Sequence, residues 1–214
     1  MGDAHITLQG IGVSLGGSPI LRDVDLRLGA GDILGVSGPN GSGKTTLLRL
    51  IATLIKPDEG AGQVLGARLG TGEVATVRTH IGMVTHTPAL ISELTLRENL
   101  VHAIRLIGGD VSRVEGALRV VGLERAADRI ASASSFGMQR RIEVARLLIT
   151  TPRLLLLDEA ISGLDSDAAS LVDALIERSI SGDGSVVIVS HDAAHLADRC
   201  RRVLNLANGH LVAP

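Results

Sequence analysis

The sequence predicts an α/β fold with a parallel sheet at its core, an antiparallel N-terminal part and an inserted helical segment. Two continuous apolar runs, Leu154–Leu157 and Val186–Val189, have the pattern of strands that are buried on both faces. A third apolar strand, Ile33–Ser37, leads into a glycine-rich loop, and leucines and isoleucines at helix spacing follow that loop. Because strands that alternate with helices are typical of parallel sheets, these runs indicate one α/β core.

Shorter strands are expected on either side of this core. Residues 6–13 and 24–28 alternate apolar and polar side chains, and the turn residues Gly16-Gly17-Ser18-Pro19 separate them. We therefore expect an antiparallel pair of strands. Residues 62–84 are predicted to form further short strands, and Asn208-Gly209 predicts a hairpin near the end of the sequence.

Residues 90–151 change character and read as helices. Thr95 and Ser112 each precede a glutamate by three residues, which is the pattern of a capping box at a helix start. Ser135 or one of its neighbours is predicted to cap a third helix that runs to about Thr150, and Ser166 starts a helix after the pattern has returned to α/β. We expect a single domain, 1–214, in which an α/β core, 1–88 and 152–214, carries a helical insert, 89–151.

Composition excludes several classes of protein. The formal net charge is −2 over 214 residues, so no general attraction to nucleic acid is expected. No apolar run approaches the ~18 residues of a membrane span, and the first residues do not read as a signal peptide. The single cysteine excludes an internal disulfide. The pair Arg140-Arg141 is interpreted as a solvated helix end or a partner contact.

The glycine-rich loop fits the phosphate-binding pattern G-x-x-x-x-G-K-[ST] without a gap. Glycines allow backbone N–H groups to turn inward around phosphates, and the helix N-terminus adds a positive dipole. The lysine ammonium can reach the outer phosphates, and the threonine hydroxyl can hold Mg²⁺. We therefore expect a nucleotide to bind at this loop and the residue after it: Gly38, Pro39, Asn40, Gly41, Ser42, Gly43, Lys44, Thr45 and Thr46.

A second set of polar residues, Asp158-Glu159, follows the apolar strand that ends at Leu157. The carboxyl edge of a parallel sheet is where such sheets bind ligands. Asp158 can hold Mg²⁺, usually through water, and Glu159 can take a proton from an attacking water. An Asp-Glu pair downstream of a phosphate loop therefore predicts nucleotide hydrolysis.

Over essentially its whole length the chain resembles the ATP-binding cassette of ABC transporters. The resemblance implies a P-loop NTPase core with a parallel sheet, an antiparallel β subdomain and an α-helical subdomain. Five landmarks carry it, in the order of the family: the phosphate loop Gly38–Thr45, the signature loop Ser134–Met138, the second nucleotide motif Leu154–Glu159, the dimer-contact loop Ser162–Asp165 and the switch histidine in Ser190-His191.

The resemblance also implies roles for single residues. Glu159 is the implied general base, and His191 the implied contact to the γ-phosphate. The implied ligands of ATP and Mg²⁺ in the first copy are those of the phosphate loop, with Thr45 and Asp158 on the metal. In the family a second copy, as a homodimer or a heterodimer, completes the site across a head-to-tail pair. The residues that this implies for the second copy are Ser135, Gly137, Met138 and Asp165.

Integral membrane subunits are the other implied partners. Because this sequence contains no membrane span, we expect those subunits to be separate chains that hold the cassette at the cytoplasmic face of the cell membrane. No nucleic acid is expected. Thr85-His86-Thr87, together with the Ser-x-Gly-Met signature, is similar to the small cassettes of haem exporters used in cytochrome c maturation.

The chain departs from the family pattern at positions around the nucleotide. Leu15 stands where the family usually has an aromatic residue that stacks on adenine, so we expect weaker nucleotide affinity and looser base selectivity. The usual glutamine that senses Mg²⁺ is absent; His86 or Thr87 takes its place, and we assign His86. Phe136 replaces the first signature glycine, and Ala160 replaces a usual proline.

Two other functions remain open beside the ATPase of a transporter. One is a cassette that acts on ribosomes or DNA, which the acidic charge and the lack of basic segments disfavour. The other is a regulatory cassette that binds ATP with weak hydrolysis, which the missing glutamine and aromatic residue keep open. His191 to His195 also imitates the H-E-x-x-H zinc helix, but it lacks the glutamate.

Overall fold

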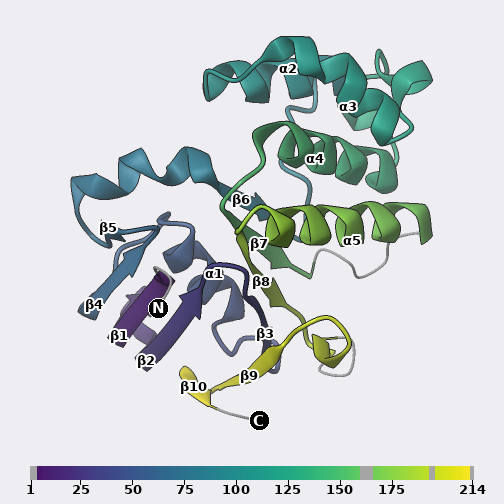
Figure 1. The fold of residues 1–214 in the computed structure, drawn as a ribbon. Coiled ribbons are helices and arrows are strands. Elements are labelled where there is room, and N and C mark those ends of the chain that lie inside the picture. Colours follow the sequence, from purple (N-terminus) through teal and green to yellow (C-terminus); the bar gives the residue numbers. More distant parts are fainter. Residues whose placement is uncertain (1–3, 160–165, 193–195, 213–214) are drawn as a thin grey trace. The chain divides into compact units, whose positions relative to one another are not determined.

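The computed structural model describes residues 4–159, 166–192 and 196–212 (Figure 1). The chain divides into two units. The first contains 1–83, 153–159 and 179–214, and the second contains 84–152 and 160–178. The predicted α/β fold is confirmed, with one antiparallel sheet, one mainly parallel sheet and a group of helices.

The first unit begins with a four-stranded antiparallel sheet in the order β2-β1-β4-β5. Glycines 16 and 17, both with positive φ, form the turn between β1 and β2, as predicted. Along β2, Val24, Leu26 and Leu28 are buried and the residues between them are exposed, because one face covers the core, whereas β1 is mostly buried between its two neighbouring strands. The strands are β1 (Ala4–Leu15), β2 (Ser18–Gly29), β4 (Glu59–Val64) and β5 (Ala67–Arg68).

The second sheet of this unit has six strands in the order β10-β9-β3-β8-β7-β6. Strands β9, β3, β8 and β7 are parallel to one another, and β10 returns from β9 through the predicted hairpin at Asn208-Gly209. Every residue of β7 and β8 is buried, which explains their unbroken apolar runs. The strands are β3 (Ile33–Ser37), β6 (Ile81–Val84), β7 (Leu154–Asp158), β8 (Ser185–Val189), β9 (Arg202–Ala207) and β10 (His210–Val212).

Helix α1 (Lys44–Ile51) and both sheets share one apolar core. Leu47 and Leu50 of α1 are fully buried together with Ile6 of the antiparallel sheet and Leu156 of the parallel sheet. Each such side chain contributes about 1.5–3 kcal/mol by its burial. The core therefore fixes α1, and with it the glycine-rich loop, against the ends of the parallel strands.

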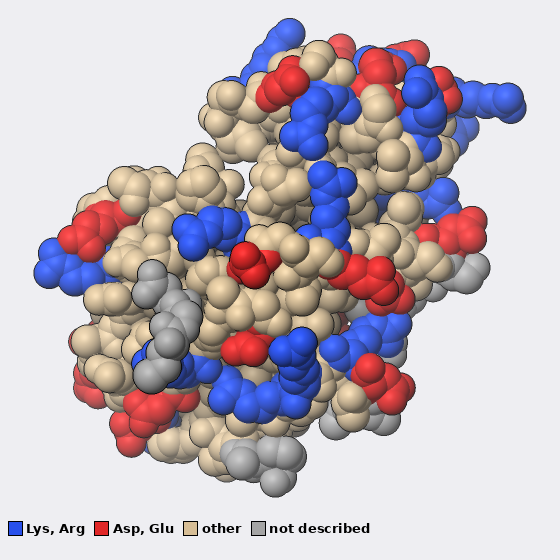
Figure 2. Space-filling model, in the orientation of Figure 1, with Lys and Arg blue, Asp and Glu red and all other residues tan. Residues whose placement is uncertain are grey.

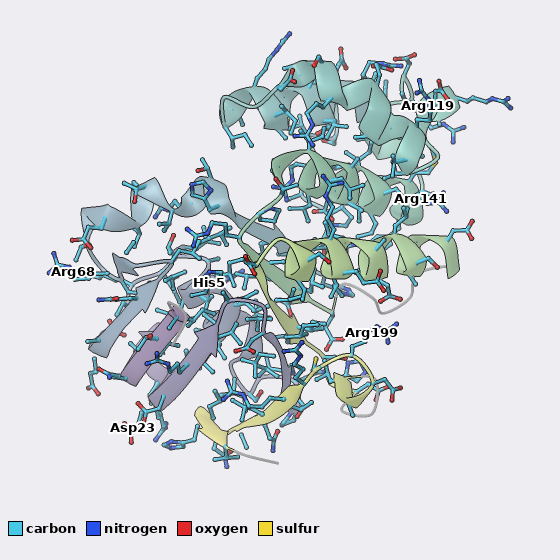
Figure 3. The ribbon with its side chains drawn as sticks, viewed as in Figure 1. His5, Asp23, Arg68, Arg119, Arg141 and Arg199 are labelled. Carbon is cyan, nitrogen blue, oxygen red and sulfur yellow. The ribbon has the colours of Figure 1, made fainter. Side chains whose placement is uncertain are left out.

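A buried polar chain that starts at His5, which Figure 3 labels, also joins the two sheets. His5 is buried on β1, and its Nδ1 lies 2.9 Å from the hydroxyl oxygen of Ser185 on β8. That hydroxyl donates to the carbonyl of Gly29, at 2.5 Å. Since the only hydroxyl proton is used there, Nδ1 of His5 must be the donor to Ser185.

The second unit contains α2 (Leu96–Leu106), α3 (Val114–Val120), α4 (Phe136–Thr150) and most of α5 (Ser166–Ser181). Helices α2 and α3 pack against α4 and against each other. The predicted capping box at Thr95 is confirmed, because both of its hydrogen bonds with Glu98 are present. Ser135 caps α4 as predicted, since its hydroxyl accepts a bond from the N–H of Met138.

Two local predictions were wrong. Ser112 does not cap α3: the carboxylate of Asp110 accepts from both the N–H and the hydroxyl of Ser112, so a short 3₁₀ turn precedes a helix that begins at Val114. Part of 62–84 is also not strand, because Gly72–Thr76 and Arg78–His80 form 3₁₀ turns. Glu73 fixes the first of these turns by pairing with Arg68.

Within the described residues, no helix has the length and apolar character that crossing a bilayer requires. On the face seen in Figure 2, basic and acidic side chains are interspersed, in keeping with a net charge of −2.

Candidate nucleotide site

Three strand ends meet at one edge of the parallel sheet. Strand β8 lies between β3 and β7, and Val189 of β8 is in register with both Val36 and Asp158. The segments that follow these strands therefore emerge side by side. They are the glycine-rich loop after β3, Glu159 after β7, and Ser190-His191 after β8. Open parallel sheets bind ligands at such carboxyl ends.

The backbone of the glycine-rich loop has a conformation that requires glycine. Gly38 has a φ of 150°, and a Cβ atom there would lie 2.3 Å from the carbonyl oxygen of Leu206 on β9. Gly43 caps α1 with a φ of 106°, and a Cβ atom there would lie 3.1 Å from the carbonyl oxygen of Ile20. The pattern glycines are thus needed for close packing as well as for the turn.

Lys44 is folded back over this loop. Its side chain is buried, and its Nζ donates to the carbonyl oxygens of Gly38, at 2.7 Å, and Pro39, at 3.0 Å. The ammonium group therefore lies at the centre of the loop's curve. The hydroxyl of Ser42 is also buried, and within the described residues it has no hydrogen-bond partner. A loop with a central cation and an unpaired hydroxyl fits the oxygens of a phosphate chain.

A cavity of about 340 Å³ opens beside the loop. At its wall the Thr45 hydroxyl donates to a carboxylate oxygen of Asp158, at 2.9 Å. A hydroxyl and a carboxylate are both hard oxygen donors, which is the donor set that suits Mg²⁺. The lining residues are Ile20, Asn40, Gly41, Gly43, Lys44, Thr45, Thr46, Asp158 and Glu159.

Glu159 is held in a strained conformation by the end of β8. Its φ is 51°, in the left-handed region that side chains other than glycine rarely adopt, and its N–H donates to the carbonyl of Val189. One carboxylate oxygen lies 2.8 Å from the N–H and 3.0 Å from Nδ1 of His191. The other accepts from the hydroxyl of Ser190, at 3.3 Å. Strain of this kind is typical of functional sites, where it fixes a side chain in one place.

The second unit presents a different set of predicted residues. Ser135 is exposed at the N-terminus of α4, and Gly137 and Met138 occupy the first turn behind it. The N–H groups of a first helical turn lack intrahelical partners, so this end of α4 can bind an anion. His86 is exposed on the loop after β6, and its carbonyl accepts a hydrogen bond from Arg140.

At the cavity, the first unit thus brings the predicted loop and helix residues together with Asp158 and Glu159, and His191 contacts Glu159. The loop and helix residues are Asn40, Gly41, Gly43, Lys44, Thr45 and Thr46. The second unit carries Ser135, Gly137, Met138 and His86. Leu15 is exposed at the end of β1, and it does not line the cavity. Asp165 lies outside the described residues.

The sequence missed two residues at these sites. Ile20 lines the cavity, and no pattern distinguishes it from the other apolar residues of β2. The interpretation of Arg140 as a solvated residue was wrong, because its side chain is only 1% exposed. Its guanidinium pairs with the carboxylate of Glu143, three residues later in the same helix, and this spacing is the signal that the sequence offers for the pair.

Comparison with known proteins gives consistent matches. The family described as ABC transporter matches residues 21–162. The cytochrome c biogenesis ATP-binding export protein CcmA of Cupriavidus necator is 36% identical over 87% of this chain and 82% of its own length. The lipoprotein-releasing system ATP-binding protein LolD of Anaeromyxobacter dehalogenans is 39% identical, over 92% and 86%.

Solved structures agree. A dimeric ATP-binding cassette in a post-hydrolysis state, bound to ADP and Pi, has a TM-score of 0.84 at 28% identity and covers 96% of both chains. An ATP-binding subunit of an ABC transporter has a TM-score of 0.85, also at 28% identity. These matches extend over the phosphate loop, the carboxylate strand and the helical unit. The chain therefore belongs to the ABC transporter family, as an ATP-hydrolysing subunit that drives transport.

Proposed function

We propose that the chain acts as one half of an ATP-sandwiched pair of cassettes, and that Glu159 activates the water that hydrolyses ATP. The single observation that carries this proposal is the strained Glu159, which His191 and Ser190 hold at the sheet edge beside Thr45 and Asp158. No other described carboxylate has this combination of strain, partners and position at the cavity.

The phosphate chain of ATP is assigned to the glycine-rich loop. Lys44 would exchange its bonds to the loop carbonyls of Gly38 and Pro39 for the more strongly charged phosphate oxygens. The buried hydroxyl of Ser42 supplies a further donor. The other loop residues, with Thr46 at the start of α1, surround the phosphates with backbone N–H groups.

Mg²⁺ fits Thr45 and Asp158, whose oxygens already lie 2.9 Å apart at the cavity wall. Bound there, the ion would neutralise charge on the phosphates. We assign His86 a part in the same ion's surroundings, in place of the family's glutamine. This assignment rests on the resemblance and on the exposure of the His86 ring.

Hydrolysis then needs a base and a contact to the γ-phosphate. Glu159 takes a proton from water as the water oxygen bonds to the γ-phosphorus, and the bond from that phosphorus to the bridging oxygen breaks, which leaves ADP and phosphate. His191 donates to the γ-phosphate. The bond that its backbone N–H makes to Glu159 keeps base and histidine in one arrangement.

A second copy of the cassette completes the site. Ser135, Gly137 and Met138 at the N-terminus of α4 would bind the γ-phosphate held by the other copy, through the serine hydroxyl and the N–H groups of the first turn, where the N–H of Met138 would exchange its bond to the Ser135 hydroxyl for a phosphate oxygen. Asp165 would couple the two sites. The pair can be a homodimer or a heterodimer, and the dimeric cassette with ADP and Pi supports pairing in general.

Separate transmembrane subunits are the proposed partners, and they would hold the cassette at the cytoplasmic face of the membrane. The relatives at 35–39% identity include an export protein of cytochrome c biogenesis, a lipoprotein-releasing system and a phosphonates import protein. Relatives that are named for different cargoes and for opposite directions of transport are thus about equally similar to this chain. We therefore assign the choice of cargo and direction to the membrane subunits. Similarity to haem exporters at Thr85-His86-Thr87 stays a prediction.

The variant Glu159→Gln tests the proposed base. It removes only the proton acceptor, so we expect ATP to bind as in the parent, hydrolysis to fall at least about 100-fold, and a dimer to accumulate with ATP. Glu124→Gln, at an exposed carboxylate of the second unit, is the matched control. Hydrolysis is measured by phosphate release and pairing by light scattering. Parental turnover in Glu159→Gln would remove the base assignment, and a parent that binds ATP with negligible turnover would favour the regulatory cassette.

A further inference from the structure

The chain's departures from the family pattern at 86 and 136 meet at one buried guanidinium, that of Arg140. We infer that Arg140 and Glu143 form a clamp that fixes the loop His86–Ala89 against the first turn of α4, and that Arg140 is thereby a positioning residue for ATP hydrolysis. This inference rests on the proposed function, because it assigns the clamped parts to the Mg²⁺ loop and to the phosphate-binding helix end.

Arg140 and Glu143 bind the loop through its backbone atoms. Arg140 donates from Nη2 to the carbonyl oxygen of His86, at 2.8 Å, and from Nη1 to a carboxylate oxygen of Glu143, at 2.6 Å. The other carboxylate oxygen of Glu143 accepts from the N–H of Ala89, at 3.0 Å. The two charged side chains of α4 thus hold both ends of a four-residue segment. Since only main-chain atoms of the loop take part, the ring of His86 stays available.

The same guanidinium supports the helix N-terminus. The central carbon of Arg140 lies 5.3 Å from the ring centroid of Phe136, within the range of a cation–π contact. Phe136 is the first residue of α4 and is 43% exposed, directly after the capping Ser135. A glycine at this position would offer no such contact. The larger residue therefore connects the helix end to the clamp, where the family has only backbone.

The cost of burying two charged side chains indicates that Arg140 and Glu143 do not stabilise the fold. Arg140 and Glu143 are 1% and 4% exposed. Burial lowers the pKa of Arg140 and raises the pKa of Glu143, and in each case it outweighs the attraction between the two; Arg146 also attracts the Glu143 carboxylate. The Nε of Arg140 has no hydrogen-bond partner among the described residues. Apolar residues of similar size in place of such a pair are often neutral or stabilising, so the pair's contribution is to geometry.

The test separates geometry from stability. In the double variant Arg140→Met with Glu143→Leu, both charges are removed and the volume is kept. We expect an unfolding midpoint equal to or above that of the parent, a kcat for ATP lowered about tenfold or more, and a KM for ATP within about twofold. KM is spared because the phosphate loop belongs to the other unit. Arg119→Met is the control, since Arg119 is exposed on α3 (Figure 3).

A mutant cycle tests the link to the helix end. Phe136→Leu keeps an apolar side chain and loses the ring. If ring and guanidinium act as one unit, Phe136→Leu and Arg140→Met together lower kcat by less than the product of their separate effects. Independent effects on kcat would remove Phe136 from the clamp. A folded double variant at 140 and 143 with parental kcat would overturn the inference.

Hydrogen exchange of the Ala89 amide distinguishes failure of the clamp from failure of the proposed function. This N–H should be protected in the parent and should exchange at least about tenfold faster in Glu143→Leu, whether or not the chain hydrolyses ATP. Equal exchange in both proteins would show that no clamp exists. A protected amide in a parent without turnover would instead overturn the proposed function. If Glu143→Leu does not fold, Glu143→Met, which keeps an unbranched side chain of similar length but has no carboxylate to accept from the Ala89 N–H, gives the same readout.

Discussion

The phosphate loop of the first unit and the N-terminus of α4 in the second unit are both proposed to bind anions, but different parts of the chain hold them in place. The loop is held by main chain: Gly38 packs against a backbone carbonyl, and Lys44 bonds to the loop's own carbonyls. The end of α4 is held by side chains, namely the cap of Ser135 and the buried Arg140 and Glu143.

This difference explains where the chain keeps the family pattern and where it departs from it. A side chain at Gly38 would collide with backbone, which cannot move away. At 136 the phenylalanine ring points to space and is backed by a guanidinium, so a large residue is accommodated in place of glycine. A site built from main chain tolerates little substitution, whereas a site built from side chains can exchange one set of contacts for another.

The largest effect is expected where the main-chain site depends on one side chain. Lys44→Ala removes both bonds across the loop and, among the described residues that line the cavity, the only ammonium. We expect ATP affinity to fall at least about 100-fold and hydrolysis to fall at least about 1,000-fold. Lys56→Ala, at the chain's one other lysine, is the control. Equilibrium binding of a fluorescent ATP analogue measures the effect, and unchanged affinity would show that main chain alone suffices.

A second prediction concerns the packing beneath the loop. Burial raises the pKa of Cys200 to about 11, and a Cβ atom on Gly35 of β3 would lie 3.0 Å from its sulfur. At pH 8 we expect iodoacetamide to label the folded chain about 100-fold more slowly than the urea-unfolded chain, because about 100-fold less thiolate is present.

The raised pKa of Cys200 also predicts how the free energy of unfolding changes with pH. The folded pKa lies above the usual value of 9.0, so the contribution of the neutral thiol is complete below about pH 9 and decreases as the pH rises toward about 11. Cys200→Ser should remove this part of the pH dependence of urea midpoints. Fast labelling of the folded protein would show that the region beneath the loop opens readily.

The smallest effect is expected at the base of the nucleotide. Leu15 is 43% exposed at the tip of β1, where a side chain can be exchanged with little effect on the core. Leu15→Tyr adds a stacking surface worth about 1–3 kcal/mol, and we expect about tenfold tighter ATP binding with a larger preference over GTP. Leu54→Tyr, at another exposed leucine, is the control. Calorimetry with ATP and with GTP measures both affinities. Equal ATP affinities in parent and variant would show that the adenine base does not bind beside residue 15.

Much of this molecule could be predicted from periodicity and motif spacing. The buried strands β7 and β8 are apolar throughout, and the phosphate pattern combines residues that only one backbone shape explains. The place of Asp158 and Glu159 at the carboxyl end of β7 also followed from the apolar run before them. In each of these cases a local pattern determines the structure, because burial or backbone conformation leaves few alternatives.

The other features depend on which of several neighbouring side chains makes a given hydrogen bond, and a sequence pattern does not decide that. Asp110 and Ser112 are both good caps, and the carboxylate wins because it accepts from the serine's N–H and hydroxyl together. Arg140 was interpreted as solvated because the sequence does not show that a carboxylate and a loop carbonyl bind its guanidinium in the folded chain. The left-handed φ of Glu159 accompanies the bond of its N–H to the carbonyl of Val189 on β8, a contact between distant parts of the sequence that no local pattern encodes.

The account's central claim, a nucleotide site shared by two copies, is tested most directly by mixing two inactive variants. Lys44→Ala disables the loop of one copy, and Ser135→Asp keeps a good helix cap but sets a negative charge against the phosphate. In a mixed pair, one site joins an intact loop to an intact helix end. We predict that the mixture hydrolyses ATP severalfold faster than the mean of the two variants alone. A rate equal to that mean would contradict the account, because each copy would then work by itself.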